Sequence, residues 1–174
     1  MSIRDSRRAE ALGHIARLLL SEGLSGSSLR SLAAAAGVSD RMLLYYFADK
    51  NEMLTEALGV LAVQMALALD AAVPAGPKRP FAILLGEIRK AMRDNGLRPY
   101  MRLWLEIASR AARAEQPYRN VAGIMADGFA GWISSRLEAT AVNEAALLLA
   151  AVEGLVVLDA AGRANLADEA AGLG

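Results

Sequence analysis

One short segment of the sequence combines side chains that suit contact with a nucleic acid. Residues 40–47, DRMLLYYF, predict a helix in which Leu43 and Phe47 point toward the core. A helix turns by about 100° per residue, so Arg41 and Tyr45 then face outward. An arginine beside an aromatic residue on the free face of a short helix suits the major groove of DNA. There the guanidinium can pair with guanine O6 and N7 or bind a phosphate.

Other groups surround this face. Met42 and Leu44 flank it, and Asp40 lies at the helix start, where we favour a capping role because phosphate would repel a carboxylate that faces DNA. Hydroxyls and backbone amides at helix N-termini can hold phosphate oxygens. The predicted DNA-contacting residues are Ser27, Ser28, Ser39, Asp40, Arg41, Met42, Leu44, Tyr45, Tyr46 and Lys50.

Some of these residues have a structural alternative. Tyr45 and Tyr46 could pack between two helices, and Lys50 could be the solvated start of the next helix. A basic cluster near the N-terminus fits either a contact with the DNA backbone or minor groove or a solvated, frayed end; it consists of Arg4, Arg7 and Arg8. Up to Leu54 the chain has seven basic and six acidic residues, so we expect only a weak electrostatic attraction to DNA.

The elements that must position this face form a helix-turn-helix pattern. Residues 28–36 predict a helix, and Gly37-Val38-Ser39 predicts a tight turn in which glycine takes a positive φ, valine fills the core and serine caps the next helix. Apolar residues over 12–19 recur at helical spacing, which predicts a preceding helix. A capping box at residues 49–52 predicts a long helix over 50–73.

The stretch SLRSLAAAAGVSDRMLLYYFADKNEML, Ser28 to Leu54, resembles the tetracycline-repressor (TetR) family of bacterial transcriptional regulators. The resemblance is carried by the order of a small residue, Gly-Val-Ser, Leu, two aromatic residues, Phe and a following Lys. The family often has Thr at the place of Met42 and Tyr at the place of Leu44, and both positions commonly touch phosphates or thymine methyls. We therefore expect Met42 and Leu44 to supply contact surface only.

The resemblance implies an all-α protein with two parts. Residues 1–50 would form a helix-turn-helix DNA-binding domain, and residues 51–174 a helical domain for effector binding and dimerisation. It further implies a cytoplasmic homodimer that binds a palindromic, double-stranded operator as a repressor, is released by a small hydrophobic or amphiphilic effector, and needs no cofactor. The alternative is a ligand-independent or architectural helix-turn-helix protein.

The composition argues against several other functions. The 174 residues include 19 basic and 19 acidic side chains, one histidine and no cysteine. Thiolate metal sites are therefore excluded, and we find no nucleophile–base pair or phosphate-binding glycine loop that would indicate an enzyme. With 55% hydrophobic but only 5% aromatic residues, the core favours helices. Prolines separate the periodic segments, which predicts further helices at about 80–94, 98–114, 117–138, 142–162 and 164–172.

The C-terminal two-thirds of the chain contain candidates for an effector pocket. Methionine and aromatic side chains at helical spacing fit either a pocket wall or an ordinary core, and Glu106 would add an acidic group suited to a cationic or amphiphilic ligand. The predicted pocket residues are Met65, Met101, Trp104, Glu106, Met125 and Phe129.

The last long helix, over 142–162, is apolar nearly all round, so every face of it must be covered. We expect a second copy of the chain to cover it, with glycines allowing close approach. The predicted interface residues are Gly128, Trp132, Leu147, Leu148, Gly154, Leu155 and Leu158. No uninterrupted apolar stretch reaches the roughly 18–20 residues of a membrane span, so we expect no membrane partner.

Overall fold

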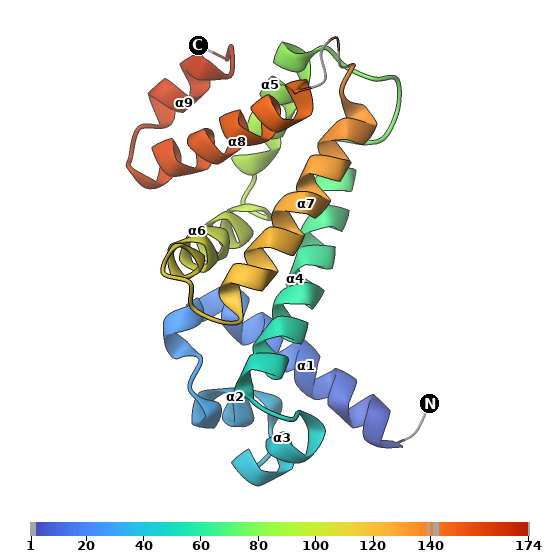
Figure 1. Ribbon diagram of the computed structural model, residues 1–174, viewed down its shortest axis with the longest axis vertical. Coiled ribbons are helices and arrows are strands. Elements are labelled where there is room, and N and C mark those ends of the chain that lie inside the picture. Colours follow the sequence, from blue (N-terminus) through green and yellow to red (C-terminus); the bar gives the residue numbers. More distant parts are fainter. Residues whose placement is uncertain (1–2, 139, 141–142, 174) are drawn as a thin grey trace. The chain divides into compact units, whose positions relative to one another are not determined.

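The computed structural model describes residues 3–138, 140 and 143–173, and in this part of the chain it is helical without a strand (Figure 1). The all-α expectation is therefore confirmed. A single-turn 3-10 helix, Leu24–Gly26, follows the first α-helix. The α-helices are α1 (Ile3–Glu22), α2 (Leu29–Ala36), α3 (Asp40–Tyr46), α4 (Lys50–Ala72), α5 (Phe81–Met92), α6 (Arg98–Ala112), α7 (Tyr118–Arg136), α8 (Glu144–Ala160) and α9 (Ala164–Ala170).

The predicted helices agree with these bounds to within a few residues. The capping box before α4 forms, because Asp49 Oδ1 accepts the Glu52 N–H at 2.8 Å and the Glu52 carboxylate accepts the N–H of Ala48. Phe47 was expected inside the third helix, but its backbone is extended and it forms the C-cap. The predicted start of the last long helix at residue 142 falls outside the described residues.

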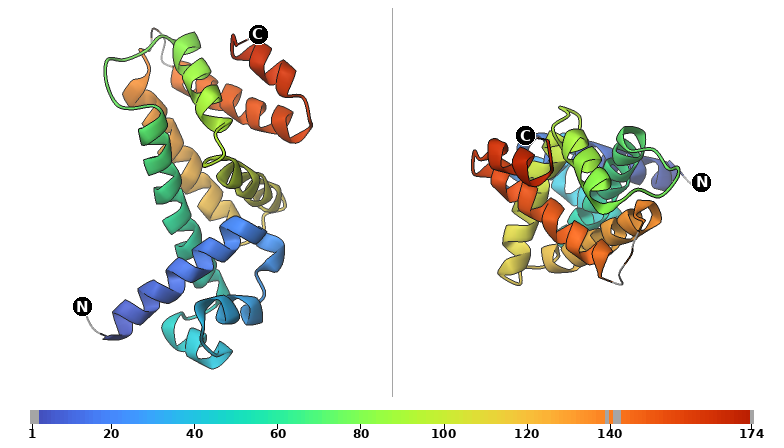
Figure 2. Two further views of the ribbon diagram at one scale, coloured as in Figure 1. Left: turned by 180° about the vertical axis from the view of Figure 1, so that it is seen from behind. Right: turned by 90° about the horizontal axis from the view of Figure 1, so that it is seen from above.

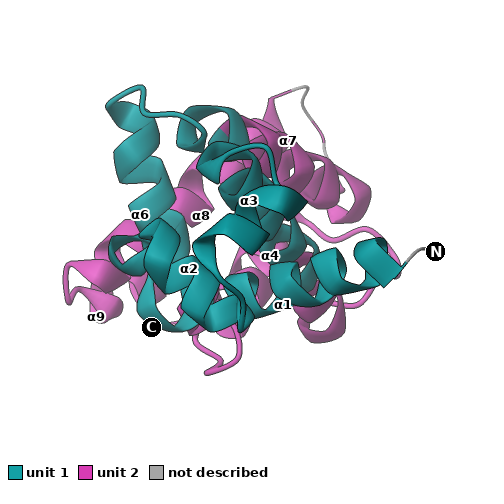
Figure 3. Ribbon diagram, turned by 90° about the horizontal axis from the view of Figure 1, so that it is seen from below, with its two compact units in different colours: residues 1–64, 102–122 teal, residues 65–101, 123–174 magenta. Residues whose placement is uncertain are grey.

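The chain divides into two compact units, which Figure 3 colours separately. Unit 1 comprises Met1–Gln64 and Arg102–Ala122, and unit 2 comprises Met65–Met101 and Gly123–Gly174. The helices α4, α6 and α7 therefore each have one end in unit 1 and the other in unit 2. These two units are defined by packing. The predicted boundary at residue 50 separates a DNA-binding from an effector-binding domain by function, and it stays a prediction.

The core of unit 1 joins α1, α2, α3 and the first turns of α4. The apolar residues that were predicted to line one face of the first helix include three that are fully buried, Ile15, Ala16 and Leu19. Burial of such side chains stabilises the fold by about 25 cal/mol for each Å² of apolar surface removed from water. Their buried partners on the other helices are Leu32, Ala33, Leu43, Phe47, Met53, Leu54, Ala57 and Leu58.

The core of unit 2 includes α8 packed against both α5 and α9, and Figure 2 shows the three helices side by side. Four residues of α8 are buried, Leu148, Val152, Leu155 and Val156. Leu84, Leu85 and Ile88 of α5 are buried in the same unit. The expectation that Leu148 and Leu155 lie on a surface between two copies is therefore wrong, because the protomer itself covers them.

A fully buried arginine ties these helices together. Arg89 of α5 makes two hydrogen bonds to Asp159 of α8 and one of 3.0 Å to Asp168 of α9. Burial by itself lowers the pKa of the Arg89 guanidinium, but the bonds to Asp159 and then Asp168 raise it above its ordinary value. Arg89 therefore stays charged, and its two carboxylate partners compensate the cost of burying it.

The helix α4 bears on the expectation that no segment of the chain is long and apolar enough to span a membrane. It has 23 residues with a mean hydropathy of 1.5 in its most apolar window, so one helix of the described chain could span a membrane by length and composition. Apolar core helices meet the same criterion, and Met53, Leu54, Ala57, Leu58 and Leu61 of α4 are buried in unit 1.

Candidate nucleic-acid interface

Local hydrogen bonds fix the turn between α2 and α3. Ser28 caps α2 by accepting the Ser31 N–H at 3.1 Å, and Ser39 caps α3 by accepting the Met42 N–H at 3.2 Å. Between them Gly37 adopts a left-handed conformation with φ 68°, which glycine takes without the strain of a side chain. The predicted caps and turn are thus present, and they set the direction of α3.

The helix α3 has one buried and one exposed side. Leu43 is fully buried and anchors the helix in unit 1, whereas Arg41 is exposed and the side chain of Tyr45 is 60% exposed. Met42 and Leu44 are also exposed, which is costly for apolar side chains unless something covers them. This face carries a cation, a phenol and two apolar groups, the combination that base edges and thymine methyls can accept.

Two predicted DNA contacts do not lie on this face. Ser27 is buried, and its hydroxyl donates to the Leu24 carbonyl at 2.7 Å. Tyr46 is buried, as is Leu43 on the same helix. This agrees with the alternative that Tyr46 packs between two helices. A phosphate cannot reach a buried side chain directly, and both residues leave the candidate surface.

The remaining predicted contacts are exposed. They are Ser28, Ser39, Asp40, Arg41, Met42, Leu44, Tyr45 and Lys50. Asp40 lies in the first turn of α3, where a carboxylate interacts favourably with the helix dipole. Neither Arg41 nor Lys50 has a hydrogen bond or ion pair with any described residue, so both cations are available to a ligand.

Two arginines of α1 hold the C-terminal end of α3. Arg4 Nη2 donates to the Tyr45 carbonyl at 3.1 Å, and its guanidinium lies 4.7 Å from the centroid of the Tyr45 ring. Arg8 Nε donates to the Tyr46 carbonyl at 2.9 Å. Cations that bind the last carbonyls of a helix satisfy groups without an intrahelical partner. Two of the three arginines of the N-terminal cluster therefore contact α3.

Arg8 contributes little free charge to this surface. Its Nη2 lies 2.5 Å from Glu56 Oε1 and 3.4 Å from Glu52 Oε1. The hydrogen bond that Arg8 donates to Glu56 is the largest cause that raises the pKa of Arg8, and Glu52 adds to it. The sequence pattern showed that arginines were present four residues apart on one helix face, but it did not show their partners about 40 residues away.

Glu106, which was predicted to bind an effector, instead supports the helix-turn-helix. Its Oε2 accepts the Leu24 N–H at 2.7 Å, at the start of the 3-10 helix between α1 and α2. Next to it Gly23 has φ 76°, and a Cβ atom at this position would overlap the Glu106 carboxylate. The carboxylate thus occupies the space that the glycine leaves, and its role as an anchor for a ligand stays a prediction.

The other predicted pocket residues do not meet in one unit. Trp104, like Glu106, belongs to unit 1, whereas Met65, Met101, Met125 and Phe129 belong to unit 2. Phe129 stacks on Trp132 with ring centroids 5.6 Å apart. The effector pocket that was expected from these six residues stays a prediction.

The predicted interface residue Trp132 bonds within its own unit. Its Nε1 donates to Asp70 Oδ1 at 2.8 Å, and the same oxygen accepts a second hydrogen bond, from Arg136 Nη2, at 2.5 Å. The Arg136 guanidinium covers the Trp132 ring at 4.1 Å from its centroid. These contacts join α7 to the end of α4 that lies in unit 2.

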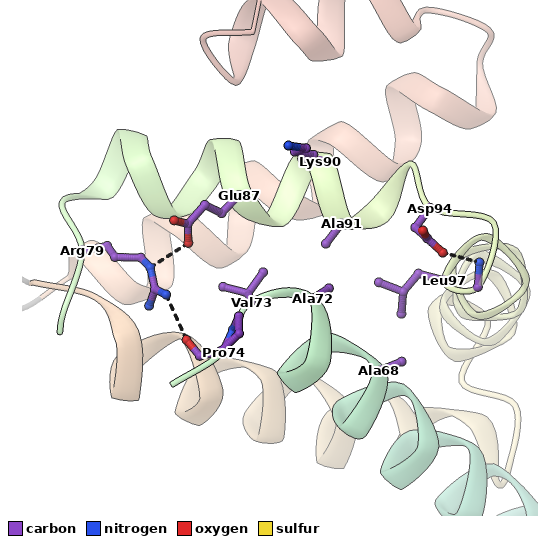
Figure 4. A pocket seen from close by; sticks show the side chains of 11 residues that line it. Ala68, Ala72, Val73, Pro74, Arg79, Glu87, Lys90, Ala91, Asp94 and Leu97 are labelled. Atoms are coloured by element: carbon purple, nitrogen blue, oxygen red, sulfur yellow. Dashed lines mark hydrogen bonds and ion pairs between the residues drawn. The ribbon is translucent and has the colours of Figure 1, made fainter. Parts of the chain in front are cut away.

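Unit 2 contains a cavity of about 450 Å³ next to the last turns of α4 (Figure 4). None of the six predicted pocket residues lines it. No group of three or more His, Asp or Glu side chains placed to hold a metal ion occurs in the part of the chain that the structure describes.

Comparisons with known proteins agree with this arrangement. Residues 12–57 match the family model of "Bacterial regulatory proteins, tetR family". The chain is similar to the crystal structure of the multidrug binding protein EbrR complexed with proflavin, with a TM-score of 0.73, 22% identity and coverage of 96% of both chains. It is also similar to a putative TetR-family transcriptional regulator from Rhodococcus sp., with a TM-score of 0.71, 18% identity and coverage of 96% of this chain and 94% of the other.

A putative transcriptional regulator from Saccharomonospora viridis in complex with choline has a TM-score of 0.68 and 18% identity, with 96% of this chain and 92% of the other covered. At these identities the likeness establishes a shared fold. No protein of curated function matches the chain. The family match spans α2, α3 and parts of the helices on either side of them, so residues 12–57 form a helix-turn-helix segment that matches the tetR-family regulators.

Proposed function

We propose that the chain is a cytoplasmic, homodimeric repressor that binds a palindromic operator through α3 and is released by a small effector. The observation that supports this most directly is the exposed pair of Arg41 and Tyr45 on a short helix that the buried Leu43 anchors. In this proposal Arg41 contacts a base edge, and Ser39 and Lys50 bind phosphates. The chain acts as a regulator without catalysing a reaction.

The dimer in this proposal uses a face that the protomer leaves uncovered. On α8 the side chains of Leu147 and Val157 are 53% and 55% exposed, and Ala150 and Gly154 lie between them at heptad spacing. On α7 Ile124 is 63% exposed. A second copy that packs there would bury these apolar side chains.

Glycines favour close packing on the same two helices. A Cβ atom added at Gly128, Gly131 or Gly154 would meet no atom of the described chain within 4 Å. The partner helix can thus approach the backbone at these positions. We therefore keep Gly128, Leu147 and Gly154 in the proposed interface, assign the half-buried Leu158 to its edge, and remove Leu148 and Leu155.

A dimer is also what specific DNA binding requires. One helix-turn-helix contacts few bases, and two copies on a two-fold axis reach half-sites about 10 base pairs apart. The small surplus of basic residues up to Leu54 gives little nonspecific attraction, so the affinity must come from base contacts made by both copies.

Effector control is favoured over the ligand-independent alternative by the cavity in unit 2. The helix α4 lines this cavity at its C-terminal end, and its N-terminal end belongs to unit 1 with α3. A ligand that binds one position of α4 better than another would shift the equilibrium between DNA-binding states.

The DNA-binding part of the proposal is tested by selecting double-stranded DNA from a random pool and measuring fluorescence anisotropy with the selected sequence. We expect Arg41→Ala to weaken binding by about 1–3 kcal/mol because a bidentate base contact is lost. The matched control is Arg119→Ala, which removes an exposed arginine of α7. Equal affinity of the Arg41 and Arg119 variants would refute the assignment of α3 as the recognition helix.

The dimer is tested with two neighbouring leucines of α8. We expect Leu147→Glu to yield a folded monomer that has lost operator binding, because Leu147 is exposed in the protomer. Leu148→Glu should instead unfold unit 2, because Leu148 is fully buried. Light scattering and circular dichroism distinguish the two results, and a dimeric Leu147→Glu variant would contradict the proposed interface.

A further inference from the structure

The ring of Tyr45 is held in place although it is exposed. Its side chain is 60% exposed and lies one helical turn from Arg41, on the same face of α3. The centroid of the Tyr45 ring lies 5.9 Å from that of Tyr46, with 58° between the two ring planes, and Tyr46 is buried. The guanidinium of Arg4, on α1, lies 4.7 Å from the Tyr45 centroid. Two groups therefore limit the rotamers that this exposed ring can adopt.

Arg4 contacts Tyr45 in two ways at once. Its Nη2 donates to the Tyr45 carbonyl at 3.1 Å, and its guanidinium lies over the Tyr45 ring. Together the two contacts fix the ring relative to the backbone of the same residue. Among the described residues no carboxylate forms an ion pair with Arg4, so its guanidinium is not drawn away from the ring.

Arg8 makes the same pair of contacts one turn further along α1, but with buried partners. Its Nε donates to the Tyr46 carbonyl at 2.9 Å, and its guanidinium lies 4.5 Å from the centroid of the Phe47 ring. Both of these aromatic residues are buried, and two glutamates pair with the guanidinium. Arg8 thus holds α3 in the core of unit 1. Arg4, in contrast, contacts a ring that adds little to this core, because Tyr45 is exposed.

We propose that Arg4 is a positioning residue for operator recognition, which holds the Tyr45 ring in the orientation that contacts DNA. The inference rests on the proposed function, in which α3 brings Arg41 and Tyr45 to the operator. A side chain that is already ordered in the free protein loses less conformational freedom when it binds. Arg4 therefore raises operator affinity and sharpens base preference through Tyr45, without contacting DNA itself.

A double-mutant cycle, measured by fluorescence anisotropy with the selected DNA, tests this role. We expect Arg4→Ala to weaken operator binding about twofold to fivefold, the size of one exposed cation–π contact. In a Tyr45→Ala background the same substitution should have no effect, because the ring that Arg4 positions is absent. An equal loss in both backgrounds would overturn the proposal, since Arg4 would then act through the end of α3 or through its own contact with DNA.

The salt dependence of binding separates positioning from a direct phosphate contact. We expect the slope of log K against log salt to be the same in Arg4→Ala and the parent protein, whereas the loss of a phosphate contact lowers it by about one. Arg17→Ala is the matched control, since Arg17 is an exposed arginine of the same helix without a hydrogen bond or ion pair to a described residue. A slope lowered by about one, or an equal loss of affinity in Arg17→Ala, would overturn the proposal.

Selection from the random DNA pool with the Arg4→Ala variant gives a readout that a merely structural role would not move. The base preference should relax at the operator positions at which Tyr45→Ala relaxes it, and it should stay at the positions that Arg41→Ala alters. Because Arg4 is exposed, we expect the variant to melt like the parent protein in circular dichroism. A base preference that is unchanged, or that relaxes at every position, would overturn the proposal.

The same variants separate this inference from the proposed function. If Arg41→Ala weakens DNA binding and Tyr45→Ala does not, α3 remains the recognition helix and only the role of Arg4 is refuted. If neither substitution weakens DNA binding, the proposed function and the role of Arg4 are both refuted.

Discussion

In unit 1 three charged side chains hold the backbone of short segments, whereas the two buried arginines of unit 2 pair with carboxylates of other helices. Arg4 and Arg8 hold carbonyls at the end of α3, and Glu106 holds an N–H between α1 and α2. In unit 2 Arg89 and Arg136 pair with carboxylates of other helices. The first kind of contact sets the orientation of a short segment, and the second kind joins long helices into one body.

The difference indicates what each unit has to do. The helix α3 has only seven residues and therefore too few contacts to fix its own direction, and side chains from α1 hold it. In the proposed function unit 2 presents a constant face to a second copy, and paired charges inside a helical core favour one arrangement of the helices. Mutations in the two networks should therefore have different effects.

The largest effect is expected in unit 2. Asp159→Ala should lower the free energy of unfolding by about 3–5 kcal/mol, because it leaves the buried Arg89 with Asp168 as its one carboxylate partner among the described residues. Arg93→Met is the control, since Arg93 contacts the same Asp168 from an exposed position and should change stability by less than about 1 kcal/mol. Urea unfolding followed by circular dichroism measures both. Equal losses would show that burial of the charge is not what matters in unit 2.

A smaller and more local effect is expected in unit 1. Glu106→Ala should cost about 1–2 kcal/mol of stability because the Leu24 N–H loses its acceptor. Operator affinity should fall further than global stability explains, since the α1–α2 connection loses its support. Hydrogen exchange at residues 23–26 and DNA anisotropy together measure this.

Glu106→Gln sharpens that test, because its amide oxygen can still accept from the Leu24 N–H. We expect this variant to keep most of the operator affinity that Glu106→Ala loses. If both variants bind DNA like the parent protein, Glu106 does not position the helix-turn-helix, and the contrast between the two units fails.

The exposed side of α3 could be predicted because the information that sets it is local. Leu43 sets the rotation of the helix, and the caps Ser28 and Ser39 and the turn at Gly37 lie within a few residues of it. Tyr46 was ambiguous because it lies at the boundary between the buried and exposed faces. Ser27 was misassigned because its burial depends on a 3-10 turn that helical periodicity does not reveal.

Unit 2 was less predictable for a physical reason. In a helix that is apolar all round, the sequence does not indicate which face is buried. Leu147 and Leu148 therefore look alike in the sequence, although Leu147 is exposed and Leu148 is buried. The cavity depends on where alanines of α4 face α5, and such a gap follows from packing rather than from residue spacing.

The central claim is that two copies of the exposed face of α3 bind DNA together. Hydroxyl-radical footprinting of the parent protein on the selected DNA tests it most directly. We predict two protected patches related by a dyad and about one helical turn apart, and both should be lost in Arg41→Ala at the same protein concentration. A single patch, or two patches that persist in Arg41→Ala, would contradict the account.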